Sequence, residues 1–138
     1  MAEFDPHALT PGARSFLTER HLATLHLTRP DGTPHVTPVG VTVDEDAALA
    51  RVITWADSYK ARLIDAGPDM PVAVCQVDGG RWLTIYGTAT VSGDPEQTAP
   101  AVAAYAERYR PPKERDDRVV IEIRIDRITG RAPDPESD

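Results

Sequence analysis

Apolar and polar residues alternate along much of the chain, and this period of two predicts β-strands. In the segment 119–128, apolar residues occupy the odd positions from Val119 to Ile125, and charged residues occupy the even positions from Glu122 to Asp126. Short turns such as Asp78-Gly79-Gly80 separate several such segments, which indicates antiparallel pairing. The same patterns predict further strands at residues 22–28, 35–43, 50–55, 72–77 and 82–91.

Helix signals occur in three segments, at residues 10–20, 59–66 and 95–109. Thr10 is suited to cap the first helix, and Pro11 to be its first residue. The second helix would be capped by Asp57 or Ser58, and the third by Asp94. About six strands with three short helices and no regular strand–helix–strand spacing predict a mainly β (α+β) fold, an antiparallel barrel.

The strand predicted at 35–43 is unusual because it is interrupted by proline. Pro34 and Pro38 lie beside and within it, and proline cannot donate a hydrogen bond to a neighbouring strand. One interpretation is an edge strand that its prolines protect from aggregation. The other is that unpaired backbone groups at residues 35–39 face a ligand. On this segment alone, the first interpretation is favoured.

Length and composition describe one soluble domain. The chain has 138 residues, of which 41% are hydrophobic and 27% are charged. No apolar run approaches the roughly 18 residues of a membrane span. We expect a loose N-terminal segment over 1–12, the barrel over 13–130 and a disordered acidic tail over 131–138. Because the N-terminus does not resemble a secretory signal and Cys75 is the single cysteine, we expect a cytoplasmic protein.

Charge and motifs exclude several classes of function. The net charge of −7 disfavours nucleic acids and membranes as partners, because both attract positive surfaces. The four histidines lack the spacing of metal ligands, and Cys75 lies in an apolar run typical of a buried residue, so we expect no metal site. Motifs of hydrolases, P-loop NTPases and Rossmann enzymes are absent.

A candidate phosphate site lies where the strand 50–55 leads into a helix. Thr54, Ser58, Lys60 and Arg62 occur there, and the free amides of a helix start, together with basic side chains, can hold a phosphate. The alternative is a serine cap followed by solvated basic residues, and the nearby Asp57 adds a negative charge.

A second candidate is the tip of the hairpin near residue 79. Gln76, Arg81 and Trp82 flank this tip and could line a planar ligand. Alternatively, Trp82 belongs to the core and Arg81 to the surface.

Taken in order, these segments resemble the split β-barrel superfamily of pyridoxamine 5'-phosphate oxidase, and within it the F420-dependent biliverdin reductase group. The resemblance spans about residues 13–130, and its ordered set of segments is more informative than any single motif. The segments are FLTERHLA (16–23), PHVTPVG (34–40), ARVIT (50–54) with Ser58 and Lys60, QVDG (76–79) with RWL (81–83), RYR (108–110) and RVVIE (118–122).

This resemblance implies a homodimer of split barrels that binds reduced coenzyme F420 in a groove at the subunit interface. The implied cofactor contacts form three groups. The deazaflavin ring would contact, largely through their backbone, His35, Val36, Thr37, Pro38 and Val39. The phosphate end would contact Thr54, Ser58, Lys60, Ala61 and Arg62. The hairpin would contribute Gln76 and Arg81. The sequence Trp55-Ala56-Asp57 departs from the small residues that the resemblance leads us to expect near the phosphate.

The implied reaction is hydride transfer from reduced F420 to an organic acceptor. Biliverdin, reduced to bilirubin, is the leading candidate, and Lys60 or Arg81 would stabilise the propionates of such a bilin. No side chain stands out as a catalytic acid. The alternatives are an FMN-dependent oxidoreductase, a non-catalytic flavin- or tetrapyrrole-binding protein of the same fold, and a structural dimer without a ligand.

Overall fold

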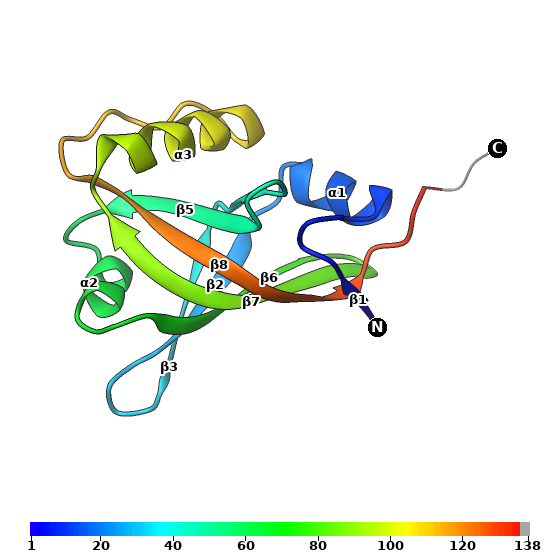
Figure 1. The fold of residues 1–138 in the computed structure, drawn as a ribbon, viewed down its shortest axis with the longest axis horizontal. Coiled ribbons are helices and arrows are strands. Elements are labelled where there is room, and N and C mark those ends of the chain that lie inside the picture. The colour runs from blue at the N-terminus through cyan, green and yellow to red at the C-terminus, as the bar shows by residue number, and fades with distance from the viewer. Residues whose placement is uncertain (136–138) are drawn as a thin grey trace.

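The computed structural model describes residues 1–135 as one curved antiparallel sheet with three short helices (Figure 1). The strand order is β3-β2-β6-β7-β8-β5-β4, and β1 pairs with β8. Within this part of the chain, the two end strands are not paired with each other, so the sheet curves without closing. The elements are β1 (Ala2–Phe4), α1 (Pro11–Thr18), β2 (Ala23–Thr28), β3 (Pro34–Val39), β4 (Thr42–Asp44), β5 (Leu49–Trp55), α2 (Tyr59–Asp65), β6 (Met70–Asp78), β7 (Arg81–Ser92), α3 (Pro95–Arg108) and β8 (Arg118–Arg131).

The predicted mainly β fold with short helices is confirmed. Thr10, Ser58 and Asp94 cap the three helices through their side chains, so Ser58 rather than Asp57 is the cap of α2. No helix in residues 1–135 is long and apolar enough to cross a membrane. In Figure 1, α3 lies beyond β5 on one side of the molecule, and the β2–β3 hairpin projects on the other.

The core lies on the inner face of the two long strands β7 and β8. Ile85, Ile121 and Ile123 are almost completely buried there, and each buried side chain of this size contributes roughly 1.5–3 kcal/mol. The β7–β8 register shifts between Tyr86 and Gly87. A Cβ atom at Gly87 would lie 2.2 Å from the carbonyl oxygen of Arg124, so the strands can approach this closely only at glycine.

The prolines of β3 do not interrupt its pairing with β2. The Arg29 amide donates to the Thr33 carbonyl at the base of the β2–β3 hairpin (2.8 Å). Because hydrogen-bonded and non-hydrogen-bonded pairs alternate in an antiparallel ladder, this bond places Pro34, Val36 and Pro38 in non-hydrogen-bonded pairs. Their backbone nitrogens therefore point to the outer side of β3, which is an end strand of the sheet. The prediction of an edge strand is confirmed.

The single strand predicted at 35–43 is in fact two strands, β3 and β4, separated at Gly40 and Val41. Two tyrosine rings of α3 pack against this break, and a Cβ atom at Gly40 would lie 2.7 Å from the ring of Tyr105. The Val41 amide donates to the hydroxyl of Tyr109 (3.1 Å) rather than to a neighbouring strand. The break is thus caused by packing from a distant helix, which a local pattern cannot reveal.

Both ends of the described chain make defined contacts with the rest of the fold. Strand β1 pairs with the end of β8, and Phe4 is buried. Ala132 is also buried, and the carboxylate of Asp134 accepts a hydrogen bond from the Gly12 amide (2.9 Å). A three-residue strand and one capping acid give no periodic signal, so the alternation of residues does not predict these contacts. Residues 136–138 of the predicted tail lie outside the described residues.

Arg108, in the last turn of α3, joins four parts of the fold. Its guanidinium donates to the carbonyls of Glu19 (2.8 Å) and Val41 (2.6 Å) and to the side-chain oxygen of Gln76 (2.6 Å). Gln76 is buried and in turn donates to the carbonyl of Phe16 (2.8 Å). Burial lowers the pKa of Arg108, and within residues 1–135 no carboxylate forms an ion pair with it. The carbonyl groups therefore compensate for the lost hydration of the charge.

Replacing Arg108 by Met should lower the free energy of unfolding by about 2–4 kcal/mol, because several partly buried acceptors lose their donor. Urea unfolding of the wild type and of Arg108→Met measures this difference. Arg110→Met removes an exposed arginine two residues away and should stay within about 0.5 kcal/mol of the wild type. Equal stability of both variants would show that the Arg108 network is not a major stabilising feature.

Glu19 connects the end of α1 to the β6–β7 hairpin through Arg81. Two hydrogen bonds join the carboxylate to the guanidinium (2.8 and 3.0 Å), and His21 lies 3.0 Å away. The hydrogen bond from Arg81, followed by that from His21, lowers the pKa of Glu19 from 4.5 to about 2. The ionised carboxylate therefore stabilises the folded chain above pH 4.5, and this contribution is lost as the pH falls toward 2.

Glu19→Gln should accordingly be less stable than the wild type at neutral pH, and the difference should shrink as the pH falls from 4.5 to about 2. Denaturant unfolding across this pH range measures the effect. Glu107→Gln, a change at an exposed acid on α3, serves as the control. A stability difference that stays constant with pH would contradict the assigned role of Glu19.

Candidate functional site

A cavity of about 190 Å³ opens where β3, the end of β5, α2, α3 and the start of β8 meet. Aromatic and proline side chains form much of its wall, and two cationic side chains face it, whereas none of its lining residues is acidic. The lining residues are Pro38, Val39, Gly40, Ile53, Thr54, Trp55, Lys60, Tyr105, Pro112 and Arg118. The sequence predicted four of these as cofactor contacts, namely Pro38, Val39, Thr54 and Lys60.

Lys60 is half-buried at this cavity and forms no ion pair within residues 1–135. Its Nζ atom lies 5.4 Å from the centroid of the Trp55 ring, a distance at which a cation and an aromatic face attract each other. Burial lowers the pKa of Lys60. The ammonium is therefore positioned by an aromatic ring and is not neutralised by an acid.

Arg118, at the start of β8, is the second cation. Its guanidinium donates to the carbonyls of Thr54 (3.3 Å) and Lys113 (2.8 Å). Burial, followed by the charge of Arg115, lowers the pKa of Arg118. Arg118 and Pro112 also line an adjoining hollow of about 520 Å³ beneath the segment 112–116, so Arg118 lies between the two spaces.

The indole of Trp55 lies within cation–π distance of a further arginine. The guanidinium of Arg115 lies 5.1 Å from the ring centroid and pairs with the carboxylate of Asp117 (2.8 Å). The Ala56 amide also donates to the Asp117 carbonyl (2.8 Å). The ring that supports Lys60 is thus itself held by the segment that precedes β8.

His35 and Thr37 lie on the inner face of β3, next to α2. The ring of His35 meets that of Tyr59 edge-on at 4.8 Å, and Nη2 of Arg29 lies 3.3 Å from its Nδ1 atom. Arginine can only donate, so Nδ1 accepts, and the remaining proton is on Nε2. Burial, helped by the charges of Arg29 and Lys60, lowers the pKa of His35, which favours this neutral form. The hydroxyl of Thr37 is buried and has no hydrogen-bond partner among residues 1–135.

The other predicted phosphate ligands bind one another. The Thr54 hydroxyl donates to that of Ser58 (3.0 Å), and the Ser58 oxygen accepts from the Ala61 amide (3.3 Å). All three residues are buried. Arg62 is exposed and donates to the carbonyl of Asp57 (3.3 Å). These four residues complete the start of α2, and of the predicted phosphate group only Lys60 presents its charge to the cavity.

The predicted hairpin residues lie outside this cavity in the single chain. Gln76 is hydrogen-bonded to Arg108 and to the Phe16 carbonyl, as described above. Arg81 pairs with Glu19 and with Asp78 (2.9 Å) and lies over the ring of Phe16. Within one chain, Gln76 and Arg81 therefore do not lie beside the predicted cofactor contacts of β3 and α2. Among the residues predicted to contact the ring, Val36 points outward from the sheet, and 47% of it is exposed.

Sequence reasoning did not identify Arg118 and Tyr105 as site residues. Arg118 reaches the cavity because β8 pairs with β5, placing it opposite Trp55. Tyr105 reaches it because α3 packs on the break at Gly40. Both contacts join segments that are far apart in the sequence, so neither leaves a local signal.

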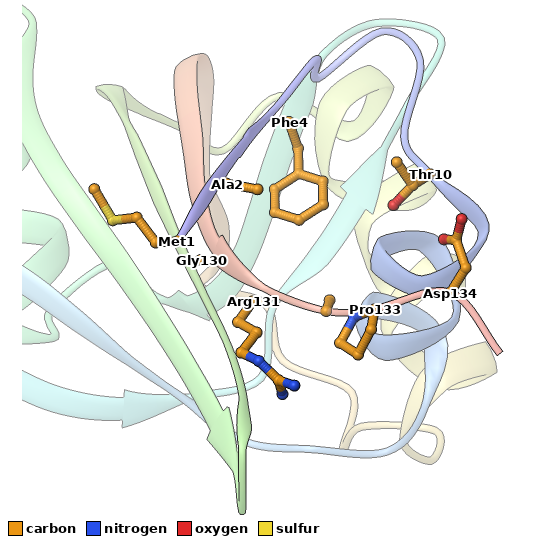
Figure 2. Close-up of a pocket in the computed structure, with 9 residues that line it drawn as sticks. Met1, Ala2, Phe4, Thr10, Gly130, Arg131, Pro133 and Asp134 are labelled. Atoms are coloured by element: carbon orange, nitrogen blue, oxygen red, sulfur yellow. The ribbon is translucent and has the colours of Figure 1, made fainter. Parts of the chain in front are cut away.

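A separate hollow of about 390 Å³ lies between the two ends of the described chain (Figure 2). Its polar groups are already engaged, because Asp134 accepts from the Gly12 amide and Arg131 donates to the Gly80 carbonyl (3.3 Å). Within residues 1–135, no three His, Cys, Asp or Glu side chains gather closely enough to bind a metal ion. The cavity at Lys60 therefore remains the candidate site.

Comparisons with known proteins agree on the family. The family model described as pyridoxamine 5'-phosphate oxidase matches residues 9–132. An F420H(2)-dependent biliverdin reductase from Mycobacterium tuberculosis (strain CDC 1551 / Oshkosh) is 44% identical over 124 residues, which cover 90% of this chain and 89% of that protein.

Solved structures extend this agreement to the fold. The structure of an F420 reductase is similar with a TM-score of 0.70 and 28% identity, covering 88% of this chain and 98% of its own. General Stress Protein 26 from Bacillus anthracis str. Sterne shares the fold with a TM-score of 0.66 and 21% identity, covering 85% of this chain and 88% of its own. The chain belongs to the pyridoxamine 5'-phosphate oxidase family.

Proposed function

We propose that this protein is an F420-dependent reductase that transfers a hydride from reduced F420 to a bilin, with biliverdin as the acceptor and bilirubin as the product. The cofactor and acceptor follow from the 44% identity to the F420H(2)-dependent biliverdin reductase, which covers nearly all of both chains. The observation that carries the proposal is the unneutralised ammonium of Lys60 in a cavity bordered by β3.

The described residues fit a phosphate-bearing planar cofactor. Lys60 supplies a charge for the phosphate, and the absence of acids from the cavity lining removes a source of repulsion. The buried Thr37 hydroxyl, which has no partner in the described part of the chain, is suited to a ligand atom that accepts or donates a hydrogen bond. FMN also carries a phosphate, so the charge of Lys60 does not by itself select F420.

Reduced F420, when bound, supplies the hydride. The chain contributes binding and orientation, and orientation matters because reacting atoms must approach within about 3–3.5 Å. In β3, the fixed φ angles of Pro34 and Pro38 and the pairing with β2 restrict movement of this edge strand. His35 stays neutral beside two cations and can donate through Nε2 without adding charge. Tyr105 and Trp55 supply aromatic surface to the wall of the cavity.

We also propose that the protein is a homodimer formed through the outer face of β3, β2, β6 and β7. One cross-strand row on this face contains Val36, His26, Ala73 and Tyr86. Val36 and Tyr86 are 47% and 44% exposed, and Val77 on the same face of β6 is 65% exposed. An apolar face of this kind favours a partner. A second copy is the occupant we infer, because it would also cover the edge of β3, where the cofactor ring is proposed to lie.

We infer a cytoplasmic location for this enzyme. Cys75 is the only cysteine of the chain, is partly exposed and has no cysteine partner. A reducing compartment keeps such a thiol unmodified.

Purified protein should bind F420 in a saturable manner, with quenching of Trp55 or Trp82 fluorescence, and bind FMN more weakly. Biliverdin should then oxidise reduced F420 only when the protein is present.

Lys60→Met should weaken F420 binding about 10-fold or more, because one charge-assisted contact is lost. Arg124→Met, which removes an equal charge from an exposed site, should have little effect. If FMN binds more tightly than F420, the protein is a flavoprotein and the F420 proposal is refuted. If F420 binds but biliverdin is not reduced, the protein is a carrier and not a reductase.

In light scattering, the wild-type protein should have the mass of a dimer. Val77→Glu should shift it toward the monomer, because the new carboxylate would be buried in the interface. Ala103→Glu adds the same charge at an exposed position of α3, outside the proposed interface, and should leave the dimer intact. A monomeric wild type, or a dimer unaffected by Val77→Glu, would refute the proposed interface.

A further inference from the structure

We propose that Arg118 binds the cofactor phosphate together with Lys60, and that Trp55 is a positioning residue which holds Lys60 for this role. The inference rests on the proposed function and adds two residues to it. It also removes Thr54, Ser58, Ala61 and Arg62 from direct contact with the phosphate.

The case for Arg118 begins with its missing counter-ion. Within residues 1–135, it forms no ion pair, although it is partly buried and the chain as a whole carries a charge of −7. Its two hydrogen bonds go to backbone carbonyls, which fix the guanidinium; Asp117 attracts its charge without bonding to it, and the neighbouring Arg115 repels it. A partly buried cation without an acid is costly, so two such cations at one cavity indicate an anionic ligand.

Lys60 and Arg118 approach the cavity from different elements. Lys60 comes from α2, and Arg118 comes from the first position of β8, opposite Trp55 in β5. An anion between them would therefore be held from two directions. The hydroxyls of Thr54 and Ser58 are less accessible to the same anion, because both residues are buried and bond to each other and to the start of α2.

Trp55 has a defined place in this arrangement. Its ring supports the Lys60 ammonium on the cavity side, and Arg115, itself neutralised by Asp117, stacks on the ring as well. The bulk of Trp55, where the resemblance leads us to expect a small residue, thus has a use: it limits the directions in which the flexible Lys60 side chain can point. We assign it as a positioning residue because its effect on the anion passes through Lys60.

The test compares F420 with a deazaflavin that lacks the phosphate, using the absorbance of the ligand to measure binding. Arg118→Met should weaken F420 binding about 10- to 100-fold and leave binding of the phosphate-free ligand within about twofold. Arg118→Lys, which keeps the charge, should recover part of the loss. Arg110→Met is the control for removing an exposed arginine. If both ligands weaken equally, or neither does, Arg118 does not bind the phosphate.

Trp55→Leu should weaken F420 binding about 3- to 10-fold, and Trp55→Phe, which keeps an aromatic face, should lose less. In the Lys60→Met background, Trp55→Leu should have no further effect on the preference for the phosphate-bearing ligand. An undiminished effect in that background would show that Trp55 acts independently of Lys60 and would overturn its role as a positioning residue.

A separate measurement distinguishes failure of this inference from failure of the proposed function. Inorganic phosphate is titrated with the wild type, Lys60→Met and Arg118→Met and observed by phosphorus NMR. If the wild type broadens the phosphate signal and both variants broaden it less, Lys60 and Arg118 bind phosphate together, even if F420 does not bind. If F420 binds strongly and neither variant weakens it, Lys60 and Arg118 do not bind the cofactor phosphate, and the reductase proposal still stands.

Discussion

The arrangement of the whole chain depends on how one arginine charge is accommodated without an acid. Arg108 ends α3, and its guanidinium gathers carbonyl groups from the end of α1 and from the chain before β4, together with the amide side chain of β6. These acceptors come from three different segments of the chain. The interaction therefore holds the end of α3 against these segments, because a buried charge needs its hydrogen-bond partners.

The candidate site inherits its geometry from that helix. With α3 fixed, Tyr105 and Tyr109 lie over Gly40, where a side chain would prevent their approach. The break between β3 and β4 follows, and Tyr105 becomes a wall of the cavity. A single buried charge thus connects folding energetics with the shape of the proposed binding site, even though Arg108 does not line that cavity itself.

Local features were predictable from the sequence because they have local causes. Alternation in β8 and the caps Thr10, Ser58 and Asp94 needed only neighbouring residues, and both were found. Short β1 was missed because three residues carry no periodicity. For the site, Lys60 was predicted at the cavity, but Arg118 was not, since only the pairing of β5 with β8 brings it there. Thr54 and Ser58 were predicted as phosphate ligands, and the structure shows their hydroxyls at the start of α2, because a helix cap and a phosphate site use the same residue types.

The pairing of β1 with the last residues of β8 has a consequence for the connectivity of the fold. Strands β1 and β8, which lie near the two ends of the described chain, are neighbours, since Ala2 lies opposite Gly130. A short peptide could therefore join them, and the chain could be opened at the exposed Asp31-Gly32 turn without cutting a core strand. The same open sheet would then be traced in a different chain order, beginning with β3 and ending with β2.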